Sequence, residues 1–160
     1  MPGDLIRRAS SASEIAQARS LFRQYAAELG VSLCFQGFDE ELASLPGAYA
    51  PPRGGLWLAG PRDAPCACVA LRPLPYGDDR DVAELKRLYV GRASRSSGLG
   101  RRLTETAIAY ARAAGYRAVR LDTLAQMHAA RALYADLGFR PCAAYYDNPL
   151  DGTLYMELAL

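Results

Sequence analysis

A glycine-containing turn between an apolar run and an amphipathic run constrains this chain more than any other feature. The apolar run is Val82–Val90, the turn is Arg95-Ser96-Ser97-Gly98-Leu99-Gly100, and the amphipathic run is Leu99–Ala114. This order predicts a strand, a turn and a helix. The first N–H groups of such a helix lack intrahelical acceptors and lie at the positive end of its dipole, and glycine lets the main chain approach a ligand closely. The turn therefore predicts an anion site suited to a phosphate or pyrophosphate.

Two common phosphate-binding motifs do not fit this turn. A P-loop needs a lysine directly after its second glycine, and Arg101 follows Gly100 here. A dinucleotide-binding fingerprint needs a third glycine where this chain has Leu103, and it usually opens a βαβ domain rather than lying past the middle of one. Arg95, Arg101 and Arg102 add positive charge around the turn, although a solvated helix face is the alternative for each of them.

The composition predicts one domain spanning residues 1–160 with a substantial core, since 51% of the residues are apolar. The net charge of +2 is too small to favour a nucleic-acid partner. No apolar run approaches the roughly 20 residues of a membrane span, and Met1–Ser10 lacks the apolar core of a secretory signal. We therefore expect a cytoplasmic protein with no membrane partner. The four cysteines have no zinc-type spacing, so no metal is expected.

Periodicity and turn residues predict a single mixed α/β domain. The capping box Ser11-x-x-Glu14 begins a helix that ends at Gly30. The other predicted helices are Asp39–Leu45, Leu99–Ala114 and Met127–Leu137, and the predicted strands are Asp4–Ala9, Leu56–Ala59, Cys66–Leu71, Val82–Val90, Ala118–Leu121, Phe139–Tyr145 and Thr153–Leu160.

Two motifs and the order of the elements resemble the GNAT superfamily of N-acetyltransferases, especially its small bacterial members. Arg95-x-x-Gly98-x-Gly100 is similar to the family's pyrophosphate loop for acetyl-CoA. Ala132-Leu133-Tyr134-x-x-Leu137-Gly138-Phe139 is similar to its penultimate helix and the exit from that helix. The resemblance covers nearly the whole chain. It implies one mixed, mostly antiparallel central sheet flanked by helices.

The resemblance also implies an activity, transfer of the acetyl group of acetyl-CoA to a primary amine by direct attack in a ternary complex. The loop amides would face the pyrophosphate, and the pantetheine arm would pair with the end of the preceding strand. The implied cofactor-binding residues are Leu88, Tyr89, Val90, Arg95, Ser96, Ser97, Gly98, Leu99, Gly100 and Arg101. One departure is Met127, which stands where several family members have an asparagine that contacts the pantetheine.

Two residues are candidates for proton transfer. By resemblance, Tyr134 is the general acid for the leaving thiolate, with a core tyrosine as the alternative. By the same resemblance, Glu84 is the candidate base, acting directly or through water. Strand alternation would place Glu84, Lys86, Leu88 and Val90 on one face. A structural Glu84–Lys86 ion pair is therefore an equal alternative to the base role of Glu84. Deprotonation of the acceptor by ordered water alone is another alternative. His128, the only histidine, has no Ser or Cys in a triad spacing.

The acceptor side carries fewer signals. The resemblance implies that the first helices and the last strands shape it, and the expected wall residues are Tyr25, Phe35, Gln36, Tyr145 and Tyr146. A small-molecule amine is the expected acceptor, without a distinction among amino acids, polyamines, aminoglycosides or a protein N-terminus. A homodimer is compatible with the resemblance. The alternative functions are a non-catalytic acyl-CoA-binding or sensing domain and a transferase for a longer acyl group.

Overall fold

The fold is built on one mixed sheet of seven strands, as the computed structural model shows for residues 5–160, the side chain of Phe35 excepted. The strand order is β1-β2-β3-β4-β5-β7-β6, and every neighbouring pair is antiparallel except β4 and β5. This confirms the prediction of a mixed, mostly antiparallel sheet. The strands are β1 (Ile6–Arg8), β2 (Gly55–Ala59), β3 (Ala67–Pro73), β4 (Val82–Val90), β5 (Ala118–Leu124), β6 (Arg140–Pro141) and β7 (Thr153–Ala159).

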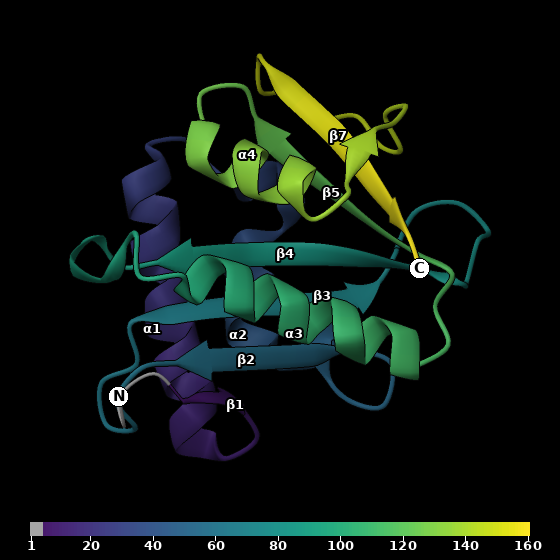
Figure 1. Ribbon diagram of the computed structural model, residues 1–160. Helices are drawn as coiled ribbons and strands as arrows, with labels where there is room; N and C mark the ends of the chain where they lie inside the picture. The colour runs from purple at the N-terminus through teal and green to yellow at the C-terminus, as the bar shows by residue number, and fades with distance from the viewer. Residues whose placement is uncertain (1–4) are drawn as a thin grey trace.

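Helices cover both faces of the sheet (Figure 1). Helices α1 (Ala12–Leu29) and α2 (Phe38–Ser44) lie behind the sheet in the view of Figure 1, and α3 (Leu99–Ala113) and α4 (His128–Asp136) lie in front of it. Each face has its own buried core, one around Phe22 and Leu58 and the other around Leu103 and Val119. Three short 3-10 turns, η2 (Cys34–Gln36), η3 (Gly47–Tyr49) and η4 (Arg92–Ser94), connect the elements.

Local sequence signals account for the bounds of α1. The Ser11 Oγ accepts a hydrogen bond from the Glu14 backbone N–H at 3.1 Å, and the Glu14 carboxylate accepts one from the Ser11 N–H at 3.0 Å. Gly30 ends the helix in the left-handed region at φ +73°. Both predicted ends of this helix are confirmed, because capping depends only on neighbouring residues.

A β-bulge changes the direction of the side chains along β4. Cys68 of β3 pairs with Tyr89 and Ala70 pairs with Lys86, so two β4 residues between these pairs face the single residue Val69. The bulged residue Arg87 has a φ of +61°. The predicted alternation along β4 is therefore wrong beyond Lys86: Leu88 and Val90 pack in the α3 core with Ala83 and Leu85, whereas Tyr89 packs in the α1 core.

Strands β4 and β5 part in the middle of the sheet. They pair only between Val82–Glu84 and Ala118–Arg120, although β4 continues to Val90 and β5 to Leu124. The second half of each strand keeps its other neighbour, β3 for β4 and β7 for β5. The opening between these two halves is where the candidate site lies.

The predicted strand Phe139–Tyr145 is largely wrong, because only Arg140–Pro141 pairs with β7. The chain then leaves the sheet, and the hydroxyls of Tyr145 and Tyr146 reach carboxylates on β4 and β5. The other predicted elements agree with the structure to within a few residues at their ends over the described part of the chain. No helix formed by residues 5–160 is both long and apolar enough to cross a lipid bilayer.

Candidate active site

A pocket of about 50 Å³ occupies the opening between β4 and β5. Four consecutive residues of each strand line it, Leu85–Leu88 and Leu121–Leu124. The remaining wall comes from α1, the following loop, α4 and the segment before β7, namely Tyr25, Leu29, Leu33, Gln36, Met127, Tyr134, Asn148 and Leu150. The pocket thus joins the second half of β4, where the cofactor arm was predicted, to the predicted acceptor wall.

Tyr134 of α4 lines this pocket and is almost fully buried. Its ring packs against Phe139, with 5.6 Å between the ring centroids. Burial raises the pKa of the Tyr134 phenol, and Tyr25 and Asp122 act in the same direction. The hydroxyl is therefore protonated at neutral pH and is a hydrogen-bond donor rather than a phenolate. This position is compatible with the predicted acid role of Tyr134.

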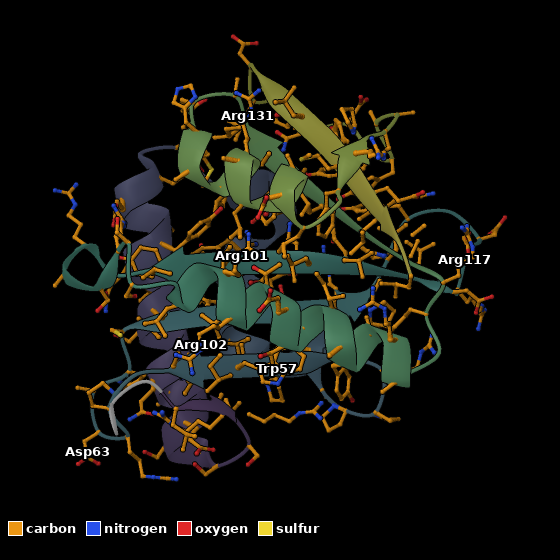
Figure 2. The ribbon with its side chains drawn as sticks, in the orientation of Figure 1. Trp57, Asp63, Arg101, Arg102, Arg117 and Arg131 are labelled. Carbon is orange, nitrogen blue, oxygen red and sulfur yellow. The ribbon has the colours of Figure 1, made fainter. Side chains whose placement is uncertain are left out.

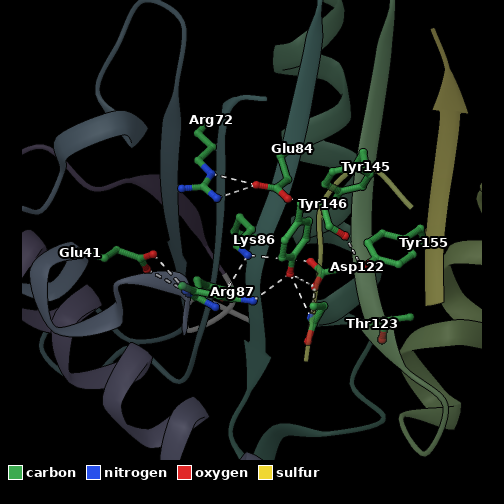
Figure 3. Close-up of polar contacts among 12 residues, drawn as sticks. Glu41, Arg72, Glu84, Lys86, Arg87, Asp122, Thr123, Tyr145, Tyr146 and Tyr155 are labelled. Atoms are coloured by element: carbon green, nitrogen blue, oxygen red, sulfur yellow. Dashed lines mark hydrogen bonds and ion pairs between the residues drawn. The ribbon is translucent and has the colours of Figure 1, made fainter. Parts of the chain in front are cut away.

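Lys86 and Asp122 form the polar wall of the pocket (Figure 3). The Lys86 Nζ donates a hydrogen bond to Gln36 Oε1 at 3.2 Å and lies 3.9 Å from Asp122 Oδ1. Asp122 Oδ2 accepts hydrogen bonds from the Tyr146 hydroxyl at 2.5 Å and from Asn148 Nδ2 at 3.0 Å. Burial lowers the pKa of the Lys86 ammonium, and this effect exceeds the opposing attraction of Glu84 and Asp122.

Glu84 lies next to this cluster but has other partners (Figure 3). Its Oε1 receives a hydrogen bond from Arg72 Nε at 2.9 Å and forms an ion pair with Arg72 Nη2 at 2.7 Å, and its Oε2 receives a hydrogen bond from the Tyr145 hydroxyl at 2.7 Å. Arg72 stands directly opposite Glu84 on β3. The ion-pair partner of Glu84 is thus Arg72, which corrects the predicted Glu84–Lys86 pair. The Glu84 side chain is 0% exposed and is not among the described residues that line the pocket.

Arg87, the bulged residue, holds α2 against the sheet. Its guanidinium donates two hydrogen bonds to the Glu41 carboxylate, at 2.9 and 3.0 Å. A paired donor–acceptor geometry of this kind fixes orientation as well as distance. The bulge therefore connects the shape of β4 to the position of the helix that follows the Gln36 turn.

The predicted anion site lies at the start of α3. Gly98 precedes the helix at φ +85°, no side chain caps the helix, and its first in-helix hydrogen bond runs from the Arg102 N–H to the Gly98 carbonyl. The earlier amides of the first turn are thus available to an anion. A Cβ at Gly100 would lie 3.7 Å from both Val90 and Leu133. The loop, the end of β4 and α4 therefore meet at one point.

The arginines of the loop have protein partners in this structure. Arg95 donates a hydrogen bond from Nε to the Val90 carbonyl at 2.9 Å and forms an ion pair with Glu28 of α1. Arg101 lies on the first turn of α3 (Figure 2) and forms an ion pair with Asp136 of α4. Both side chains are nearly half exposed. Each pair is therefore open to water and worth about 1 kcal/mol or less, which leaves an incoming phosphate able to compete for either arginine.

The predicted acceptor residues divide into two groups. Tyr25 and Gln36 line the pocket. Tyr145 and Tyr146 lie behind its polar wall, where they bind Glu84 and Asp122, and the Tyr146 ring stacks on Tyr76 at 4.7 Å. The Phe35 side chain lies outside the described part of the structure. His128 begins α4, is exposed, and lines a separate groove between α4 and β7.

Sequence reasoning missed Asp122 and the place of Lys86 in the pocket. The predicted strand ended at Leu121, one residue before Asp122, whereas β5 continues to Leu124. Lys86 is the only lysine of the chain and falls within an apolar run, and that isolation was the available signal for a buried functional amine. Over residues 5–160, no group of three His, Cys, Asp or Glu side chains is arranged to hold a metal ion.

Comparisons with known proteins agree with this geometry. Residues 19–139 match the sequence model of the Acetyltransferase (GNAT) family. An uncharacterized N-acetyltransferase of Schizosaccharomyces pombe is 36% identical over 143 residues, covering 89% of this chain and 86% of that protein. The uncharacterized N-acetyltransferase YjgM of Escherichia coli is 31% identical over 122 residues, covering 74% of this chain and 72% of its own.

Solved structures share the fold over the full length. An acetyltransferase of Streptococcus agalactiae superimposes with a TM-score of 0.79 at 20% identity, and the match covers 100% of both chains. The protein yncA of Salmonella typhimurium, solved with its cofactor acetyl-CoA, gives a TM-score of 0.69 at 19% identity over 98% of this chain and 94% of its own. The chain belongs to the GNAT family of acetyltransferases. It is accordingly an acetyl-CoA-dependent N-acetyltransferase.

Proposed function

We propose that this enzyme transfers the acetyl group of acetyl-CoA to the primary amine of a small molecule by direct attack in a ternary complex. The main support for this proposal is the separation of β4 from β5 beyond their last paired residues. It leaves the backbone of Leu88–Val90 without a β5 partner beside a pocket that contains Tyr134. A thioester beside that backbone would reach the pocket from the α3 side, and an amine would enter from the α1 side.

The start of α3 would hold the pyrophosphate of the cofactor. The uncapped amides after Gly98 and the dipole of a 15-residue helix favour an anion there. The pantetheine arm would run along Leu88–Val90 and pair with the β4 backbone. A β4 amide in this segment would then donate to the thioester oxygen, an interaction worth about 3 kcal/mol of transition-state stabilisation when well aimed.

Tyr134 would donate a hydrogen bond or a proton to the departing thiolate. Tyr134 lines the pocket, and its hydroxyl stays protonated at neutral pH. The role of Glu84 as the base stays a prediction. The fully buried Glu84 carboxylate already accepts two hydrogen bonds, from Arg72 and Tyr145, and is ion-paired with Arg72, so we assign it to positioning Tyr145 and the end of the sheet.

A small acceptor fits the size and charge of the pocket. About 50 Å³ admits an amine and a short chain, and the Asp122 carboxylate on the wall is complementary to an ammonium group. The same size favours an acetyl group over a longer acyl chain. A cytoplasmic location accords with four free cysteines. We expect the enzyme to bind neither nucleic acid nor a membrane. A homodimer is compatible with the fold.

Calorimetric titration with acetyl-CoA, with free CoA and ATP as controls, tests the cofactor assignment. We expect micromolar binding of both CoA compounds and no comparable binding of ATP. Thiol release with a panel of small amines and a panel of peptide N-termini then tests the acceptor class. Binding without turnover on either panel would favour an acyl-CoA sensor, and no binding would overturn the proposal.

A further inference from the structure

We infer that Lys86 is the general base that takes the proton from the acceptor ammonium. The inference rests on the proposed function, since it names a group for the same reaction. Lys86 lines the pocket together with Tyr134 and Leu88, whereas Glu84 is sealed behind Arg72 and Tyr145. The amine that must lose a proton would therefore meet the Lys86 Nζ rather than the Glu84 carboxylate.

The residues around Lys86 fix the position of its Nζ but give its positive charge little stabilisation. Its side chain is 4% exposed. The only hydrogen bond that its Nζ makes to the described residues goes to Gln36 Oε1 at 3.2 Å, a neutral acceptor. Asp122 Oδ1 lies 3.9 Å away, beyond direct hydrogen-bond distance. The hydrogen bond to Gln36 uses an N–H of Lys86, so the lone pair of the neutral amine can point into the pocket, where an acceptor ammonium would lie.

The charged groups around Lys86 come from three strands and α2. Glu84 is bound to Arg72, and Arg87 is bound to Glu41, so these four side chains form two nearly neutral pairs. Asp122 remains as the carboxylate closest to Lys86, and two neutral donors, Tyr146 and Asn148, already hydrogen-bond to its other oxygen. Burial therefore outweighs attraction, and the pKa of Lys86 lies below its ordinary value of 10.5.

The proton balance of the reaction is complete with this assignment. The neutral Lys86 Nζ takes one proton from the acceptor ammonium and later releases it to solvent through the pocket. The freed amine lone pair forms the C–N bond to the acetyl carbon, and the C–S bond breaks. The nitrogen loses a second proton as the amide forms. Tyr134 gives its proton to the CoA thiolate, and the second proton lost by the nitrogen restores the Tyr134 phenol through solvent in the pocket.

Because Lys86 is the only lysine of the chain, its titration can be measured directly. Protein prepared with lysine labelled at ¹³Cε and ¹⁵Nζ gives one side-chain signal, followed by NMR from pH 6 to 11 in the free enzyme. We expect a midpoint below the ordinary lysine pKa of 10.5, because burial disfavours the charged ammonium. A midpoint at 10.5 or above would overturn the inference. This measurement needs no variant and no acceptor.

Substitutions then separate a base from a charge that merely attracts the acceptor. Lys86→Gln removes both functions, whereas Lys86→Arg keeps the positive charge but cannot accept a proton near neutral pH. We expect both variants to lose kcat/KM by at least about 100-fold at pH 7, the scale of general base catalysis. In both, the loss should shrink by about tenfold per pH unit above the measured Lys86 midpoint, as the free acceptor amine becomes available, while acetyl-CoA affinity stays within twofold of the wild type.

Two results would overturn the assignment. A Lys86→Arg enzyme that keeps wild-type activity while Lys86→Gln loses it would identify a charge anchor. A Lys86→Gln enzyme within threefold of the wild type would show that the amine is deprotonated elsewhere. Arg140→Gln, which removes an exposed charge from β6, is the matched control and should retain activity. A wild type that binds acetyl-CoA but acetylates no amine would contradict the proposed function alone, since the Lys86 titration stays readable.

Discussion

Removing the Tyr134 hydroxyl should separate catalysis from folding cleanly. Its ring lies in the core against Phe139, the residue also lines the pocket, and no hydrogen bond contributes to its raised pKa. Tyr134→Phe therefore removes no hydrogen bond to the described residues and keeps the ring contacts. We expect the free energy of unfolding to stay nearly the same, because neither a protein hydrogen bond nor ring packing is lost.

The same change should lower turnover strongly. General acid catalysis contributes about 10²–10⁴-fold, which corresponds to about 2.7–5.4 kcal/mol of activation free energy at about 1.4 kcal/mol per factor of ten. CoA thiol release at saturating amine measures kcat, and calorimetry measures the affinity for acetyl-CoA. We expect kcat to fall at least tenfold with the affinity unchanged.

Tyr49→Phe provides the matched control. The Tyr49 hydroxyl is buried without a hydrogen-bond partner, in the core on the α1 face and away from the pocket lining. That variant should be as stable as the wild type or more stable, with full activity. A Tyr134→Phe enzyme whose kcat stays within threefold of the wild type would refute the acid assignment. A loss of affinity equal to the loss of activity would assign Tyr134 to binding instead.

Four further predictions concern the loop, the buried carboxylate and the first helix. Gly100→Ala should leave stability unchanged or raised, since a Cβ there makes only ordinary contacts, yet calorimetry should show weaker acetyl-CoA binding. Gly98→Ala should cost about 1 kcal/mol in denaturant unfolding because of its φ of +85°. Glu84→Gln should destabilise the protein by roughly 3–5 kcal/mol, because it leaves the partly buried Arg72 charge without an ion-pair partner. The acidic limb of the pH–rate profile should not move. A shifted limb would identify Glu84 as the base. Ser11→Ala should lower the free energy of unfolding by about 1 kcal/mol with kcat unaltered, and an equal loss of kcat would contradict a purely structural cap.

The parts of the fold that were predictable depend on short-range signals. The capping box and Gly30 delimit α1, and the glycine turn before Leu99 begins α3, because both features involve residues a few positions apart. The buried run Val82–Val90 was predicted with its observed ends. These elements are also the ones that carry the cofactor motif, so the cofactor side of the site was readable from sequence.

The acceptor side depends on contacts between distant strands, which local patterns do not encode. Arg72 neutralises Glu84 because the β3–β4 register places them opposite each other, and nothing near Glu84 in the sequence indicates that register. Asp122 lies near Lys86 because each residue stands two positions beyond the last β4–β5 pair, which joins Glu84 to Arg120. The strand predicted to include Tyr145 fails for the same reason, since its hydroxyl is drawn to Glu84 across the sheet.

One extra residue in β4 accounts for the arrangement of both halves of the site. With strict alternation, Leu88 and Val90 would share the α1 face with Lys86. The bulge at Arg87 instead leaves Leu88 and Val90 in the α3 core while Lys86 and Arg87 reach partners on the α1 side, Gln36 and Glu41. Apolar side chains thus flank the proposed thioester path, and a lysine and its carboxylate neighbour face the proposed acceptor. A variant that removes the bulge should therefore lose amine acetylation even where acetyl-CoA still binds.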